Sequence, residues 1–313
     1  MSKVYEVITS QIVEQLEQGV VPWARPWKVD GLAPSNLLSR RPYRGINVFL
    51  LGFRAASTPW WLTFRQAKAL GGAIRAGERS TPVIFWRWVD RSGRETEAGG
   101  ASEGSRAPRR ERLPVLRYYS VFNLDQTEGI DPSKVPAADA VAVAPVPTAE
   151  EIVAGFQEPP TIEHRAQPRA FYRPATDSVT MPPRSAFGRA EGYYSTLFHE
   201  LTHATGHSKR LARPGFDKNH AAPFGSEPYA REELVAELGA AFLCGEAGIE
   251  PDIPNSAAYI DHWRQNLSRD SRLVITAAQQ AQRAADYILG RATRALEESA
   301  AQSEEPAGDE QAA

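Results

Sequence analysis

The stretch LFHELTHATGH, residues 197 to 207, holds three of the six histidines of this chain. In a helix His199 and His203 lie one turn apart on the same side, so both imidazoles can reach one ion. Glu200 then projects beside them, where it can take a proton from water. This HExxH arrangement predicts a zinc site with two histidine ligands and a glutamate general base. The alternative, two core histidines that happen to flank a glutamate, has a chance frequency on the order of 0.01.

A catalytic zinc usually has three protein ligands and one open position. His207 is nearest in the sequence, but it follows Gly206, where the helix is expected to end. The extended pattern HExxHxxGxxH is absent, because its last histidine would fall at Lys209. The third ligand is therefore expected from another segment.

The segment SEPYAREELVAELGAAFLCGEAG, residues 226 to 248, predicts a helix with carboxylates on a face of small residues. We expect Glu233 to be the third ligand and Glu237, one turn on, to bond to the outer nitrogen of a ligand histidine. Glu232 is the fallback ligand. The alternative makes all three glutamates part of a solvated helix face.

Such a site would lower the pKa of water to about 7 and, with Glu200, suit amide hydrolysis. The donor to the oxyanion stays open among four side chains: Tyr229, Tyr259, His207 and His262. AFYRPATDSVTMP, residues 170 to 182, predicts an edge strand that could hold an extended peptide, or else a purely structural hairpin.

These motifs require elements to position them, and the sequence predicts two α+β domains. The N-terminal domain is expected to contain helices at about 3–18 and 63–71 and an antiparallel pair of strands at 82–89 and 115–122. The C-terminal domain is expected to be a zincin core with a short sheet, the HExxH helix at about 190–205, the glutamate helix at about 229–246 and closing helices after 256.

Changes of composition predict the boundaries. Residues 1–130 form the first domain, with a mobile loop at 91–114, and a Pro- and Ala-rich linker follows at 131–147. Residues 148–296 form the second domain. The acidic tail 297–313 is expected to be disordered.

The charge of the chain is divided unevenly. Residues 1–125 carry 19 Lys and Arg against 11 Asp and Glu, although the whole chain has a net charge of −2. The single cysteine, Cys244, fits a reducing compartment. The N-terminus lacks the apolar block of a signal peptide, and no apolar run is long enough to span a membrane, so we expect a cytoplasmic protein.

The basic part also contains six of the seven tryptophans, several of them beside cationic residues. Bases of single-stranded DNA stack on aromatic rings while their phosphates pair with cations, whereas a duplex hides its base faces. The predicted DNA-binding side chains are Trp23, Trp27, Arg44, Trp60, Trp61, Phe64, Arg65, Lys68, Arg75 and Arg79. The alternative makes Trp86, Trp88, Phe49 and Leu50 core residues, while the proline-flanked tryptophans only close a loop.

Several segments resemble one known family. PWARPW, YRGINVFLL, WWLTFRQAKALGGAIRAGERSTPVIFW and YYSVFNLDQ are similar to the N-terminal domain of ArdC-type antirestriction proteins and to the N-terminal part of plasmid TraC primases. FHELTHATGH and EELVAELGAAFL resemble the zincin domain that completes ArdC. The resemblance implies single-stranded DNA binding, a metallopeptidase fold and protection of incoming plasmid or phage DNA from restriction. It also implies His199, His203 and Glu233 as ligands and Glu200 as the base.

Three classes of function stay open. The first is a DNA-bound peptidase with a host protein as substrate. The second is a single-strand binder whose zinc is purely structural. The third is a replication or primase accessory protein, disfavoured because no cluster of acidic residues resembles a polymerase site. Acidic DNA mimicry is disfavoured by the basic N-terminal half.

Overall fold

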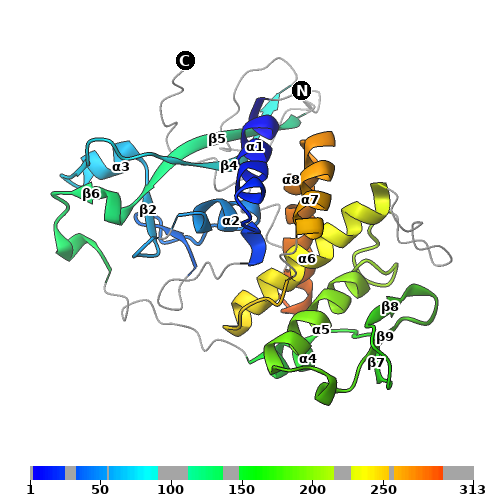
Figure 1. Ribbon diagram of the computed structural model, residues 1–313. Coiled ribbons are helices and arrows are strands. Elements are labelled where there is room, and N and C mark those ends of the chain that lie inside the picture. Colours follow the sequence, from blue (N-terminus) through cyan, green and yellow to red (C-terminus); the bar gives the residue numbers. More distant parts are fainter. Residues whose placement is uncertain are drawn as a thin grey trace, which may run out of the picture.

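The computed structural model describes residues 3–24, 33–54, 56–90, 112–136, 148–214, 227–253 and 257–291. Figure 1 shows the strands of the N-terminal part on one side and the helices of the C-terminal part on the other. Helices and strands both contribute substantially, which confirms the α+β class. No helix in these ranges is long and apolar enough to cross a membrane.

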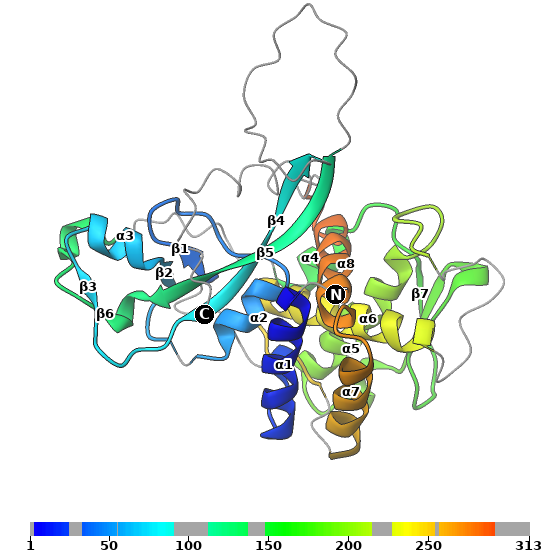
Figure 2. The same ribbon diagram turned by 90° about the horizontal axis from the view of Figure 1, so that it is seen from above.

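A four-stranded sheet with the order β1-β2-β5-β4 forms the N-terminal part. Its strands are β1 (Ser35–Asn36), β2 (Trp60–Leu62), β4 (Thr81–Asp90) and β5 (Arg112–Asn123). β4 and β5 pair antiparallel, with Thr81 opposite Val121, and form the long ribbon of Figure 2. Because side chains alternate between the faces of a strand, Val83 packs with Val121 in a small cluster while Ile84 reaches the main core.

A short helix and a two-stranded sheet lie at the outer end of this part. They comprise α3 (Phe64–Ala69), β3 (Ala73–Ile74) and β6 (Thr127–Glu128). α3 begins with a capping box, in which the Thr63 hydroxyl accepts the Gln66 N–H and the Gln66 side chain accepts the Thr63 N–H. Gln66 Oε1 also accepts a hydrogen bond of 3.2 Å from Asn36 Nδ2, so the loop after β1 is held beside α3.

The C-terminal part has a three-stranded sheet with the order β7-β9-β8. Its strands are β7 (Thr161–His164), β8 (Phe171–Arg173) and β9 (Ser178–Met181). Its helices are α4 (Ala149–Gly155), α5 (Ala190–Thr205), α6 (Glu227–Ala247), α7 (Ala257–Arg269) and α8 (Leu273–Ile288). α6 packs between α5 and α8, and its buried side chains are mostly apolar.

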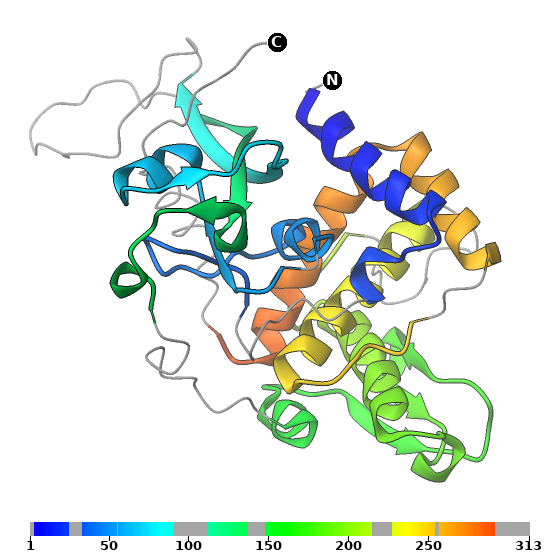
Figure 3. The ribbon, with the colours of Figure 1, turned by 60° about the vertical axis from the view of Figure 1, so that its left-hand side comes forward.

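One hydrophobic cluster runs through both parts of the chain. Helix α1 (Lys3–Glu17) lies against α7, as Figure 3 shows, and α2 (Ile46–Gly52) contacts α8. The Phe49 ring stacks on Phe242 with centroids 4.9 Å apart. The two parts therefore share a core, and the proposed domain boundaries remain a prediction.

The long periodic elements agree closely with the sequence. The HExxH helix has the predicted bounds, and the helices expected at 3–18, 63–71 and 229–246 correspond to α1, α3 and α6. Phe49 and Leu50 are buried as expected, and Trp86 packs against the main core. Most of the expected loop 91–114 and linker 131–147, and all of the tail 297–313, lie outside the described residues.

Candidate metal centre

α5 presents two histidines to the same point in space. The helix forms because Leu197, Phe198 and Leu201 share its buried side, and it ends before Gly206. His199 Nε2 lies 3.1 Å from His203 Nε2. Two nitrogens each about 2.1 Å from a tetrahedral zinc are about 3.4 Å apart, so this spacing suits a shared ion.

Glu233 of α6 completes the cluster. Its Oε2 lies 3.5 Å from His199 Nε2, and its Oε1 lies 3.7 Å from His203 Nε2. Within the described part of the chain, these three side chains form a group whose ligand atoms all lie within 4.8 Å of one another. Two imidazoles and one carboxylate are a common donor set for zinc, so the residues fit a divalent cation.

A close approach of two helices makes this convergence possible. Gly239 of α6 faces Thr202 of α5, and a Cβ at position 239 would lie only 2.4 Å from Thr202 Cγ2. Thr202 is fully buried and cannot turn into solvent. Glycine therefore lets α6 come near enough for Glu233 to reach the histidines of α5.

The electrostatics of the cluster favour a cation. Burial opposes protonation of His199, but the hydrogen bond to Glu233 and the charges of Glu200 and Glu233 raise the pKa of His199 to about 9. Burial alone would raise the pKa of Glu233, yet its histidine neighbours lower that pKa to about 2. Glu200 is buried, with 7% of its surface exposed. The site thus concentrates negative charge beside two imidazoles.

Glu232, rather than Glu237, holds the outer nitrogen of a ligand histidine. The Glu232 Oε1 atom lies 3.1 Å from His203 Nδ1. Buried Arg213 donates to both Glu232 oxygens, at 3.1 and 2.6 Å, and to the Thr202 carbonyl at 2.8 Å. Glu232 is therefore a partly buried, paired carboxylate that fixes the orientation of His203.

The expected role of Glu237 is wrong because its carboxylate is bonded to other side chains and not to a histidine nitrogen. Glu237 accepts a hydrogen bond of 3.1 Å from Trp23 Nε1 and another from the Tyr259 hydroxyl. Burial raises the pKa of Glu237, an effect that these hydrogen bonds oppose. Position 237 lies one turn further along α6 than position 233, and its side chain reaches Trp23 of the N-terminal part.

Among the four candidate oxyanion donors, Tyr229 is nearest to the cluster by its interactions. Burial and the charge of Glu233 raise the pKa of Tyr229 to about 12, and Glu200 contributes to the same shift. The Tyr259 hydroxyl is bonded to Glu237, and the exposed His262 bonds Asn266.

The fourth donor candidate, His207, is buried, and its Nδ1 accepts the Lys209 N–H at 3.2 Å. The metal-ligand group does not include it.

Arg213 is the functional residue that sequence reasoning missed. No local pattern marks it, because its importance depends on folding back over α5.

The expected edge strand is partly found. β8 is at one edge of the three-stranded sheet and pairs antiparallel with β9, whereas β9 is central and fully buried. Both strands contact α5. Within residues 170–182, β8 therefore provides the edge.

Three of the four tryptophans predicted to bind DNA are in the core. Trp23, Trp60 and Trp61 expose 1%, 5% and 1% of their surface, so their rings cannot stack on bases in this conformation. The reason is that each fills a contact between elements: Trp23 meets Trp263, and Trp60 and Trp61 lie in the buried strand β2. Trp27 lies outside the described residues.

The predicted cationic residues divide into two groups. Arg44 forms an ion pair with buried Asp286 of α8, and Arg75 forms one with Glu78 at 2.8 Å. These two arginines therefore have structural partners. The remaining predicted side chains are on the surface around α3, namely Phe64, Arg65, Lys68 and Arg79.

Comparisons with known proteins agree with this arrangement of a basic N-terminal part and a metal-type site. Residues 2–122 match the family model for the N-terminal domain of anti-restriction factor ArdC. Residues 147–280 match the model for a zincin-like metallopeptidase. The architecture is thus that of a zincin-like metallopeptidase domain joined to an ArdC N-terminal domain.

Solved structures have the same architecture over most of the chain. The metal-free and Mn(II)-bound crystal structures of the antirestriction protein ArdC from plasmid R388 have TM-scores of 0.67 and 0.69 with this chain. Each is 34% identical and covers 95% of this chain and 98% of the other. The chain belongs to the ArdC family of antirestriction proteins.

Curated relatives extend the picture to longer proteins. Two DNA primases TraC of Escherichia coli are 36% and 34% identical over 91% and 95% of this chain. The chain spans only 20% and 28% of the length of these primases. A protein of Sinorhizobium fredii called y4eC is 35% identical, with 91% of each chain covered.

Proposed function

We propose that this chain binds single-stranded DNA through its N-terminal part and protects incoming plasmid or phage DNA from restriction in the cytoplasm. We further propose that the C-terminal part is a zinc metallopeptidase that acts on a host protein. The observation that carries the chemical half is the convergence of His199, His203 and Glu233 beside the buried carboxylate of Glu200. A structural site requires the ligands but has no use for Glu200.

A zinc ion bound by the three ligands would supply a Lewis acid that polarises a peptide carbonyl and acidifies water. Glu200 would accept the proton of the attacking water and pass it to the leaving amine. Tyr229 would donate its hydroxyl proton in a hydrogen bond to the developing oxyanion. The edge strand β8 would bind the substrate as an extended peptide through backbone hydrogen bonds.

Zinc is proposed because of the donor set. Two imidazole nitrogens and one carboxylate suit zinc, and such sites bind zinc more tightly than manganese. The R388 relative has a structure described as Mn(II)-bound, which supports a divalent cation in the equivalent domain of that protein. Metal analysis of protein purified without added metal, followed by competition between zinc and manganese, tests the proposed ion.

The surface around α3 supports the DNA half. Phe64 exposes 58% of its surface, and Arg65 and Lys68 are exposed on the same short helix. No Asp or Glu occurs between Asp30 and Glu78, whereas several arginines and one lysine do. An exposed ring beside exposed cationic side chains favours single strands, in which bases are free to stack.

The decisive experiment is a DNA-transfer assay into a restricting host. Wild type and Glu200→Gln are compared at equal expression, with zinc content and single-strand binding measured for both. Glu191→Gln, which changes a carboxylate in the first turn of the same helix, is the matched control. We expect Glu200→Gln to lose protection while it retains zinc and DNA binding.

Full protection by Glu200→Gln would instead support the second candidate, a DNA-binding protein with a structural zinc. A third candidate, a primase accessory protein, is motivated by the two TraC relatives. A primase accessory protein would affect priming but would not affect the survival of unmodified DNA. The same transfer assay, carried out with modified and unmodified DNA, therefore distinguishes this candidate from an antirestriction protein.

A further inference from the structure

Several hydrogen bonds hold the loop between β1 and the segment leading to α2. Asn36 Oδ1 accepts the backbone N–H groups of Leu38 and Ser39 at 3.1 and 3.0 Å. The Arg40 N–H donates to the Asn36 carbonyl at 2.9 Å. Arg40 adopts a left-handed conformation with φ of 62°, which an arginine seldom does. The turn therefore fixes the direction in which Arg40 projects.

Arg40 covers the face of a buried tryptophan. Its guanidinium carbon lies 5.3 Å from the centroid of the Trp60 ring, within the range of a cation–π contact. Trp60 is 5% exposed, whereas Arg40 is an exposed residue. The Trp60 ring thus supports the guanidinium from below, and solvent reaches Arg40 from outside.

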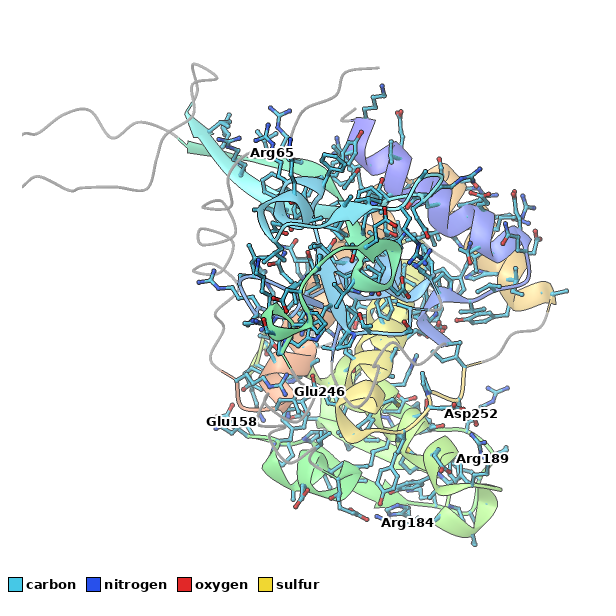
Figure 4. The ribbon with its side chains drawn as sticks, turned by 90° about the vertical axis from the view of Figure 1, so that its left-hand side faces the viewer. Arg65, Glu158, Arg184, Arg189, Glu246 and Asp252 are labelled. Carbon is cyan, nitrogen blue, oxygen red and sulfur yellow. The ribbon has the colours of Figure 1, made fainter. Side chains whose placement is uncertain are left out.

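The surroundings of this pair are apolar and cationic. Leu38 exposes 44% of its surface on the same loop, and Arg41, which follows Arg40 in the chain, is also exposed. The Asn36–Gln66 hydrogen bond holds the loop against α3, which bears Phe64 and Arg65. In Figure 4, Arg65 lies near the top of the view and Arg189 of the C-terminal part lies near the bottom.

We propose that Arg40 is a base-stacking residue for single-stranded DNA, with its guanidinium plane supported by Trp60 and flanked by Leu38. Arg41 neutralises a neighbouring phosphate, and the strand continues over α3. This inference rests on the proposed single-strand binding and assigns it a site. Guanidinium planes stack on bases as aromatic rings do, so Arg40 replaces the ring face that Trp60 does not expose.

The test measures binding of a fluorescein-labelled oligo(dT) by anisotropy over a range of salt concentrations. A second oligonucleotide of equal length has abasic positions at its centre, and a duplex is the third probe. Arg40→Lys keeps the charge but removes the plane. Arg40→Asn removes both while it tolerates the left-handed turn. Arg189→Lys, at an exposed arginine of the C-terminal part, is the matched control.

We expect Arg40→Lys to weaken oligo(dT) binding about fivefold, with an unchanged salt dependence and no effect on the abasic oligonucleotide. Arg40→Asn should weaken oligo(dT) binding by about tenfold or more. Arg41→Ala should reduce the slope of log K against log salt by about 0.7 for both oligonucleotides. Thermal unfolding of each variant checks that the fold is retained.

If Arg40→Lys lost the same affinity for the oligo(dT) and for the abasic oligonucleotide, the stacking role would be overturned. Unchanged binding by both Arg40 variants, with wild type still binding oligo(dT), would overturn the site and leave the proposed function intact. Duplex binding as tight as oligo(dT) binding would also contradict stacking. Failure of wild type to bind oligo(dT) at all would refute the proposed function itself.

Discussion

Gly239→Ala is expected to separate the two helices that form the metal centre. The added Cβ would lie 2.4 Å from Thr202 Cγ2 and 2.7 Å from Thr202 Oγ1, whereas ordinary contacts begin at 3.4 Å. Relief of the clash therefore requires a shift of about 1 Å between α5 and α6. Overpacking of this kind costs about 1–3 kcal/mol.

The shift should also weaken the site, because α5 carries His199 and His203 while α6 carries Glu233. We expect the free energy of unfolding to fall by about 2 kcal/mol and the zinc Kd to rise about tenfold. Urea unfolding of the metal-free protein and competition with a chromophoric zinc chelator measure the two quantities separately.

A second variant provides an internal control for this prediction. Thr202→Ala removes both clashing atoms, and its lost hydroxyl bonds only the Phe198 carbonyl one turn earlier in its own helix. The double variant Thr202→Ala/Gly239→Ala should regain most of the stability and zinc affinity, which gives a coupling energy in a double-mutant cycle. Gly239→Ala with wild-type stability and wild-type zinc Kd would refute the close-approach argument.

Three further predictions concern other contacts of the same core. Glu233→Gln should lower zinc affinity by more than about 100-fold, because loss of a residue that only hydrogen-bonds a metal ligand already costs about 10–100-fold. An unchanged zinc Kd in titration with a zinc chelator would contradict this prediction. Trp23→Phe removes the N–H that Glu237 accepts and should lower the free energy of unfolding by about 1–2 kcal/mol without changing oligo(dT) affinity. Burial alone would raise the pKa of Asp177, but hydrogen bonds, chiefly from the buried Arg210, lower it. The Asp177–Arg210 pair should therefore stabilise the protein above about pH 4 and lose that contribution as the pH falls further. Asp177→Asn should cost about 3 kcal/mol at pH 7 and less at pH 2, and a constant difference in urea unfolding across this range would be the contrary result.

The sequence by itself determined the long helices and the juxtaposition of two histidines on one of them. The spacing of four places His199 and His203 on one side of any helix that contains them, whatever packs around it. Leu197, Phe198 and Leu201 then select the buried side. For Glu233, helical phase separated the proposed ligand from its neighbour Glu232 without any knowledge of the tertiary structure.

The tertiary structure decided what packs against those helices. Glu237 is in phase with Glu233, but one turn further along α6 its side chain meets Trp23, a contact between residues 214 positions apart. Arg213 reaches Glu232 only because the chain folds back after α5. Such partners depend on long-range packing, which local periodicity does not encode.

The same distinction explains the tryptophans. Aromatic rings beside cations have the same local pattern whether they cover a core or bind a base, because both uses remove an apolar face from water. Composition therefore identified a basic, aromatic N-terminal part but could not show which rings are exposed. Packing buried Trp23, Trp60 and Trp61 and left Phe64 and Arg40 at the surface, since each buried ring fills space between two elements that only the folded chain brings together.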